Sequence, residues 1–200
     1  MRAFARHRLA FGFILGAFAA TALFYSQLPN LLPMHWDIHG RPGTFQPKWW
    51  AAWVVPISAA LVTTSLAWLL IPKRTSTIII NAVAGFMSYL CGVTLYVAIH
   101  PSESPVPYAF MGVGLLLMVV GNILGKLTWD FFVGIRTYWT VDDPDVWERT
   151  HRVSGPVYVF GGLAILAASI AHATTPILLA LLLATSLYPM IYSYLVWRRG

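Results

Sequence analysis

The sequence predicts an all-α fold, namely a polytopic membrane protein built as a bundle of six transmembrane helices. Hydrophobic residues make up 58% of the chain and charged residues only 10%, whereas about a quarter of the residues are charged in ordinary soluble domains. A membrane-spanning helix needs about 20 predominantly apolar residues. Each such stretch has to be helical because lipid offers no hydrogen-bond partners to the backbone. The six stretches that qualify are residues 9–26, 50–71, 78–99, 106–125, 155–172 and 176–197.

The basic residues that give the chain its formal net charge of +6 predict its orientation. With six spans, Arg41 and Lys48 fall on one side of the membrane and the other eleven Lys and Arg residues on the opposite side. Cytoplasmic loops carry an excess of Lys and Arg, so we expect both termini in the cytoplasm. This distribution is a topology signal, and it argues against direct binding of nucleic acid. The eleven residues are Arg2, Arg6, Arg8, Lys73, Arg74, Lys126, Arg136, Arg149, Arg152, Arg198 and Arg199.

The first apolar stretch also has features of a signal peptide, namely a basic start and small residues near Ala20 and Ala22. Cleavage there would leave the remaining loops in the same orientation, so the charge bias does not decide between the two interpretations. Because the apolar run is long for the core of a signal peptide, we expect a retained helix.

We expect residues 1–200 to form one membrane domain with two polar segments, an outer loop over residues 27–48 and an inner loop over residues 126–154. The interiors of the six stretches hold no Asp, Glu, Lys, Arg or His. Ionisable residues inside membranes mark proton relays, ion paths and catalytic sites. A proton-coupled pump and an intramembrane aspartyl protease are therefore disfavoured, and any specific chemistry has to come from the two loops.

The outer loop contains the stretch LPMHWDIHGRPG, in which two histidines and an aspartate alternate. An extended backbone would place His35, Asp37 and His39 on one face, and imidazole and carboxylate groups are ligands of divalent transition metals. A metal site would need further ligands from another element, for which His100 and His172 are candidates. The alternative, which we prefer, is an ordered cap over the helix ends with no metal or other cofactor.

The inner loop carries the signals of a short helix over residues 144–153. Asp143 followed by Pro144 is a favourable pair for the N-cap and the first helical position. An apolar stripe on one face is typical of a helix that lies in the headgroup region, where tryptophan side chains act as anchors. The stripe consists of Val146, Trp147, Thr150 and Val153.

Two polar contacts are expected in the inner loop. Glu148 and His151 are close enough on the helix to meet, and Glu-x-x-His supplies ligands in some di-metal bundles. A local hydrogen bond between them is the simpler alternative. Three roles are open for Arg136. It could form an ion pair that folds the loop, or present its charge to a cytosolic partner. Alternatively, Arg136, Lys126, Arg149 and Arg152 could together bind lipid headgroups. The acidic residues available to Arg136 are Asp130, Asp142, Asp143 and Asp145.

Both loops resemble the signatures of the SdpI-type immunity protein family. LPNLLPMHWDIHGRPG resembles the Pro-x-His-Trp-x-x-x-Gly loop that follows the first span in that family, and the inner loop resembles its second signature. The six-span layout extends the resemblance over nearly the whole chain. Gly43 stands where relatives commonly carry an acidic residue, and Asp37 where asparagine is common. The residues that match the second signature are Gly121, Asn122, Gly125, Lys126, Phe132, Gly134, Ile135, Arg136, Thr137, Trp139, Thr140, Val146, Trp147, Thr150, His151 and Gly155.

The resemblance implies a non-enzymatic immunity or signalling protein of the bacterial cell membrane. The family takes its name from a protein that protects a sporulating bacterium against a secreted toxic peptide and holds a repressor at the membrane. The implied partners are the lipid bilayer, a membrane-active toxic peptide at the outer loop and a cytosolic regulator at the inner loop. Two alternatives stay open: a metal-dependent membrane enzyme that uses the loop His, Asp and Glu residues, and a transporter of small molecules or lipids.

The candidate functional residues belong to the two loops, and none is assigned a catalytic role. Those of the outer loop, for binding, are His35, Trp36, Asp37, His39 and Gly40. Those of the inner loop, for binding or coupling, are Asn122, Lys126, Arg136, Thr137, Trp139, Trp147, Glu148, His151 and Arg152.

Overall fold

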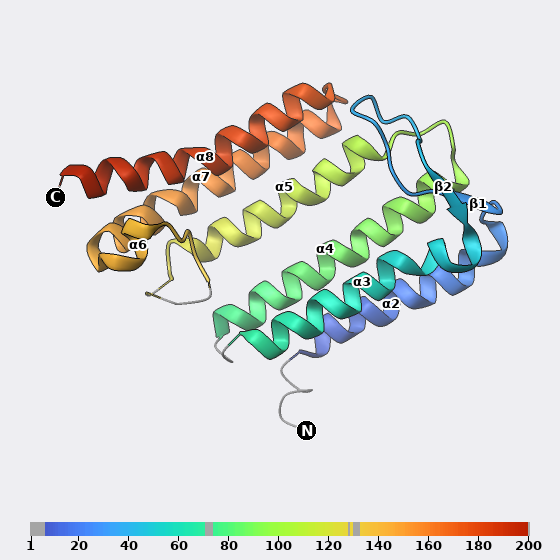
Figure 1. Cartoon of the computed structure of the whole chain (residues 1–200), viewed down its shortest axis with the longest axis horizontal. Coiled ribbons are helices and arrows are strands. Elements are labelled where there is room, and N and C mark those ends of the chain that lie inside the picture. Colours follow the sequence, from blue (N-terminus) through green and yellow to red (C-terminus); the bar gives the residue numbers. More distant parts are fainter. Residues whose placement is uncertain (1–6, 71–73, 128, 130–132, 200) are drawn as a thin grey trace. The chain divides into compact units, whose positions relative to one another are not determined.

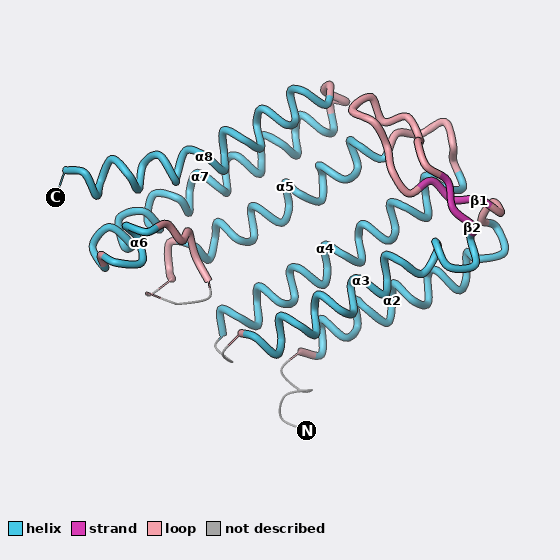
Figure 2. Tube along the Cα trace, in the orientation of Figure 1, coloured by secondary structure: helices cyan, strands magenta, loops and turns pink. Residues whose placement is uncertain are grey.

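The structure is a computed structural model of the chain, and it describes residues 7–70, 74–127, 129 and 133–199. It confirms the all-α class, because six helices are long and apolar enough to cross a membrane (Figure 1). They are α2 (Arg8–Phe24), α3 (Lys48–Leu69), α4 (Arg74–Ile99), α5 (Pro105–Leu124), α7 (Pro144–Ile170) and α8 (Thr175–Arg199). Figure 2 also shows three short elements between them, β1 (Leu31–Pro33), β2 (Phe45–Pro47) and α6 (Tyr138–Asp142). A short 3-10 helix, η1 (Tyr25–Gln27), follows α2.

The chain divides into two compact units, and the first comprises Met1–Gly112. In this unit α2, α3 and α4 pack against one another, and the hairpin of β1 and β2 lies at one end of these helices (Figure 1). Leu28 and Leu32 from the segment between α2 and α3 are buried with Ala17, Ala51 and Cys91 of the helices. Small helix residues leave room for the two leucines, so this cluster fixes the hairpin on the helix ends.

The second unit comprises Val113–Gly200, in which α7 packs along α8 and α6 contacts both. Glycines bring the backbones of α5 and α7 together. A Cβ atom added to Gly162 would lie 2.5 Å from the carbonyl oxygen of Gly114, and one added to Gly121 would lie 2.7 Å from that of Gly155. Interfaces of small residues let membrane helices approach closely and gain van der Waals contact.

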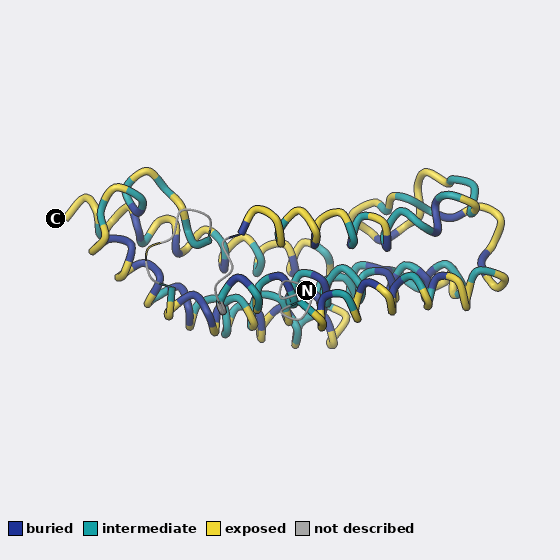
Figure 3. The backbone as a smooth tube through the Cα atoms, turned by 90° about the horizontal axis from the view of Figure 1, so that it is seen from below, coloured by how far each residue is buried: buried dark blue, intermediate teal, exposed yellow. Residues whose placement is uncertain are grey.

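Most of the apolar surface of the long helices faces outward. Each candidate span buries only 22–28% of the residues in its most apolar window, and exposed positions recur along the helices in Figure 3. Leu15 and Phe160, for example, are 67% and 68% exposed. Side chains of this kind are suited to contact with lipid tails, which supports the membrane assignment.

The structure differs from the expectation at the end of the inner loop. A short helix over residues 144–153 and a separate span from residue 155 were expected, but α7 runs unbroken from Pro144 to Ile170. Pro156 lies inside it. Proline removes a backbone donor without ending the helix when neighbouring helices support the backbone, as they do in membrane bundles.

Candidate functional site

The segment between α2 and α3 is a hairpin with two different faces. Its strands pair antiparallel, with Leu32 opposite Gln46 and Pro33 opposite Phe45. Successive strand residues point to opposite faces. Leu32 therefore enters the core cluster, whereas Leu31 and Phe45 remain 54% and 48% exposed. The hairpin is held by one face and presents apolar side chains on the other.

The hairpin tip is a turn organised by the carboxylate of Asp37. Its Oδ1 accepts the backbone N–H groups of His39 and Arg41, each at 2.8 Å, and the N–H of Gly40 donates to the Asp37 carbonyl at 2.9 Å. Aspartate commonly folds the chain in this way, because its side chain bonds the backbone two residues on. The tip is therefore a turn, and the extended backbone that would have placed His35, Asp37 and His39 on one face is not formed.

Two of the residues considered as metal ligands, Asp37 and His100, have other contacts. Within the described ranges, no group of three His, Cys, Asp or Glu residues is placed to hold a metal ion. Asp37 caps its own turn, whereas the side chains of His35 and His39 are exposed. The ring of His100 stacks on Tyr96 with 4.4 Å between ring centroids, and His172 belongs to the other unit. The side-chain geometry of the hairpin therefore supports a folded tip.

The turn at Asp37 should depend on pH only in acid. The hydrogen bond from the backbone N–H of Arg41 holds the pKa of Asp37 below its ordinary value of 3.8. Desolvation opposes this, whereas the N–H of His39 and the charges of His39 and Arg41 lower the pKa further. A depressed pKa means that the stabilisation is fully present above pH 3.8 and is lost as the pH falls through the lower folded value.

We expect the amides of His39 and Arg41 to stay protected from hydrogen exchange at neutral pH and to lose protection in acid. Asp37→Asn should keep protection at both pH values, because its amide oxygen also accepts hydrogen bonds, and Asp37→Ala should lack protection at both. Exchange at the tip that is the same for wild type and Asp37→Ala would contradict this role of the carboxylate.

Gly40 joins the hairpin tip to the loop before α5. Its φ angle is +76°, and a Cβ atom would lie 2.0 Å from Oγ and 2.9 Å from Cβ of Ser104. Only glycine combines this backbone conformation with so close an approach. The contact sets the distance between the hairpin and the loop that contains Ser104.

Gly40→Ala is expected to lower the free energy of unfolding by about 1–3 kcal/mol, because it adds backbone strain and a collision with Ser104. The measurement is the unfolding midpoint of the purified protein. Gly43→Ala is the matched control, since its Cβ atom would meet nothing closer than the His35 carbonyl oxygen at 3.6 Å. Ser104→Gly in the Gly40→Ala background should recover part of the loss, and the absence of any recovery would refute the collision.

In the second unit, the buried side chain of His151 connects α7 to the GIRT segment, residues 134–137. His151 is only 1% exposed. Its Nε2 accepts the backbone N–H of Ile135 at 2.9 Å, and its Nδ1 lies 2.8 Å from the carbonyl oxygen of Trp147. Because Nε2 accepts, the ring is neutral and Nδ1 carries the proton that it donates to Trp147.

Gly134 and Trp147 complete this connection. The indole of Trp147 stacks on the His151 ring with 4.0 Å between centroids. Gly134 has a φ angle of +139°, and a Cβ atom there would lie 2.5 Å from the Trp147 ring and 2.6 Å from His151 Nε2. Trp147 is 2% exposed, so its predicted role as a headgroup anchor was wrong. It packs inside the protein because the GIRT segment covers it.

A capping box fixes the other end of the GIRT segment. The Thr140 amide donates to Oγ1 of Thr137 at 3.3 Å, and Oγ1 of Thr140 accepts the Thr137 amide at 2.8 Å. Oγ1 of Thr140 also donates to the Ile135 carbonyl at 2.8 Å. Trp139 then donates from Nε1 to Oγ of Ser193 on α8 at 2.7 Å. The segment is thus bonded to both α7 and α8.

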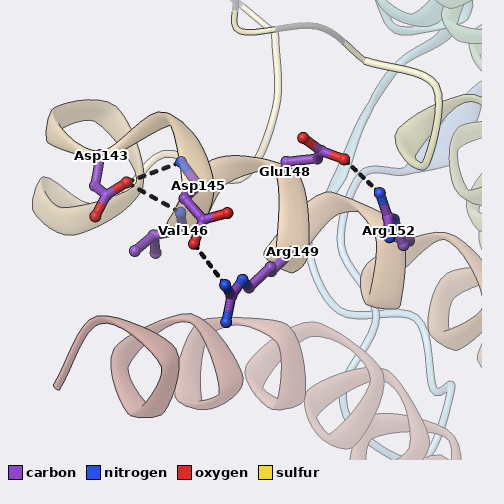
Figure 4. A network of polar contacts seen from close by, with 6 residues as sticks. All are labelled: Asp143, Asp145, Val146, Glu148, Arg149 and Arg152. Atoms are coloured by element: carbon purple, nitrogen blue, oxygen red, sulfur yellow. Dashed lines mark hydrogen bonds and ion pairs between the residues drawn. The ribbon is translucent and has the colours of Figure 1, made fainter. Parts of the chain in front are cut away.

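The predicted contact between Glu148 and His151 is not formed. Figure 4 shows that Glu148 pairs with Arg152, one turn further along α7. His151 points instead into the protein, where both ring nitrogens have backbone partners. The pair was expected from spacing alone, which does not tell the buried face of a helix from the exposed one.

Two of the acidic residues considered as partners of Arg136, Asp143 and Asp145, make contacts within the first turns of α7. Asp143 accepts the amides of Asp145 and Val146 as the N-cap, and Asp145 pairs with Arg149 at 2.8 Å (Figure 4). Exposed ion pairs of this kind contribute little to stability. Asp130 lies outside the described residues.

The remaining predicted residues lie at the surface. Lys126 and Asn122 are exposed, and Nζ of the lysine lies 3.4 Å from Oδ1 of the asparagine. The sequence alone assigned no role to Ser104 and Glu103, which lie near the hairpin. The feature that could have pointed to them is the loop HPSESP, because its single carboxylate is the one acidic residue outside the two longer loops.

Six apolar helices, a folded polar hairpin and a second polar segment bonded to two helices define a multi-pass all-α membrane protein. A family model of the SdpI/YfhL protein family matches residues 126–193, and that of a domain of unknown function (DUF1648) matches residues 12–60. Over residues 126–193 the chain is therefore similar to the SdpI/YfhL protein family.

A curated relative extends this likeness over most of the chain. The immunity protein SdpI of Bacillus subtilis (strain 168) is 22% identical over 154 residues, which cover 74% of each chain. No solved structure matches the chain. The two family models between them include the hairpin and the GIRT segment, the two places where the structure concentrates specific polar contacts.

Proposed function

We propose that this chain is an immunity protein that protects a bacterial cell against a membrane-active toxic peptide. The observation that carries the proposal is the similarity over 154 residues to the immunity protein SdpI. The structure supports a binding role, because the hairpin is folded and presents an apolar face beyond the helix ends.

In this proposal the hairpin lies outside the cell and the GIRT segment inside, where it couples to a cytosolic regulator. The distribution of Lys and Arg between alternate loops supports this orientation. The GIRT segment is bonded to α7 through His151 and to α8 through Trp139. A regulator that binds it would therefore act on a surface continuous with two membrane helices.

The orientation is tested by cysteine labelling, because Cys91 is the single cysteine and is buried. In a Cys91→Ala background, Arg41→Cys should react with a membrane-impermeant maleimide on intact cells. Arg149→Cys should react only after the membrane is opened. The reverse pattern would invert the proposed orientation.

Protection is tested by expressing the chain in a strain that a secreted toxic peptide kills. Survival should rise with expression of the wild-type chain. His151→Leu, which removes the hydrogen-bond acceptor of Ile135, should reduce signalling to the interior. Killing that is unchanged at confirmed membrane expression, for every candidate peptide, would overturn the immunity proposal.

A further inference from the structure

The apolar face of the hairpin forms one wall of a groove. The groove has a volume of about 420 Å³, which lies within the range of roughly 300–1,000 Å³ common for ligand pockets. Leu31, Pro33 and Phe45 come from the strands, and Trp36 is held at the tip by its bridge to Pro42. This wall is built before any ligand arrives, since the opposite face of the hairpin is fixed in the core.

The other wall comes from the end of α4 and the loop that follows it. Val97 and Ile99 supply apolar surface, and Glu103 supplies a carboxylate. The contact of Gly40 with Ser104 sets the spacing of the two walls, because Ser104 adjoins Glu103 and Gly40 belongs to the hairpin tip. Both walls belong to the first unit.

Glu103 carries the charge of the groove. The hydroxyl group of Tyr108 donates to its Oε2 at 3.1 Å, which holds the carboxylate in place while Oε1 accepts no hydrogen bond from the described part of the chain. No basic side chain pairs with it in residues 7–70, 74–127, 129 and 133–199. Lys48, the nearest basic residue in sequence to β2, donates instead to the Leu28 carbonyl at 3.1 Å.

We propose that this groove binds an apolar peptide segment through a lysine or arginine side chain that pairs with Glu103. The inference rests on the proposed function, and it names the chemistry of the peptide: apolar residues against the hairpin and one cation at the carboxylate. Membrane-active peptides commonly combine these features. Because the fixed carboxylate of Glu103 repels anionic lipid headgroups, it favours binding of a cationic peptide over binding of such lipids.

The test measures binding of three short probe peptides to the purified full chain in a neutral detergent. Each probe has four leucines around a central Lys, Gln or Glu, with blocked ends and a neutral fluorescent dye. We expect the Lys probe to bind about tenfold more tightly than the Gln probe, and the Glu probe to bind least. Equal binding of the three probes to the native protein would overturn the proposal without any variant.

Glu103→Gln keeps an acceptor for Tyr108 and removes the charge, so it should bring the Lys and Gln probes to within about twofold of each other. Asp145→Asn is the matched control, because that carboxylate lies on α7 in the other unit and should leave binding of the Lys probe unaffected. A lipid is tested with phosphatidylethanolamine in nanodiscs. If Glu103→Gln weakened binding of this lipid but left binding of the Lys probe unchanged, the groove would be a lipid site and the proposal would fail.

The survival assay separates this inference from the proposed function. If the Glu103→Gln chain protects cells as well as the wild-type chain does, the proposed peptide binding in the groove is wrong and the immunity proposal stands. If the chain binds the Lys probe selectively but protects no cell, the proposed peptide binding in the groove stands and the immunity proposal is wrong.

Discussion

Gly162→Leu is expected to lower the free energy of unfolding by at least about 3 kcal/mol, the upper end of the cost of overpacking. A Cβ atom at Gly162 would lie 2.5 Å from the Gly114 carbonyl oxygen and 3.0 Å from the Met118 amide nitrogen. These are backbone atoms, so α5 and α7 would have to separate to admit the side chain. That separation would also remove the neighbouring contact of Gly121 with Gly155.

The measurement is the unfolding midpoint of the purified protein in detergent, with Gly162→Ala as an intermediate expected to cost about 1–3 kcal/mol. Gly16→Ala in α2 and Gly92→Ala in α4 are matched controls, because a Cβ atom at either position meets nothing within 4 Å. Alanine raises helix propensity, so the controls should stabilise by about 0.5–1 kcal/mol. A Gly162→Leu protein as stable as the controls would show that α5 and α7 are not held at this distance.

The positions of the helices follow closely from the sequence, because one signal determines them. Lipid requires long apolar helices, and the start of α5 at Pro105 and the end of α3 at Leu69 each fall within a few residues of the predicted limits. The start of α7 was the exception. A short helix over residues 144–153 and a separate span from residue 155 were expected, but one helix runs through both and contains Pro156.

The contacts within the two polar segments could not be predicted from the sequence as the helices could. Asp37 and His39 alternate in sequence, and the local bonding of the carboxylate to the backbone overrides the extended conformation that alternation suggests. His151 and Glu148 have the spacing of a pair, but the packing of the GIRT segment on α7 buries only the histidine. Long-range contacts such as that of Gly40 with Ser104 leave no local pattern in the sequence.

His151→Leu is expected to release the GIRT segment from α7. Leucine fills much of the same space but accepts no hydrogen bond, so the Ile135 amide loses its partner at a cost of about 1–3 kcal/mol. His151→Ala also leaves a cavity beneath Trp147 and should cost about 3–5 kcal/mol in total. His151→Gln should lose less than either, because its amide oxygen is an acceptor.

Hydrogen exchange of the peptide that contains Ile135 measures this release directly, alongside the unfolding midpoint. His151→Leu should speed exchange there while α2 to α4 exchange as in wild type, because those helices belong to the other unit. His39→Leu is the control, since that exposed side chain lies at the hairpin tip. If His151→Leu lowered the midpoint without faster exchange at Ile135, the histidine would act through core packing alone, and the GIRT segment would be held by Thr140 and Trp139.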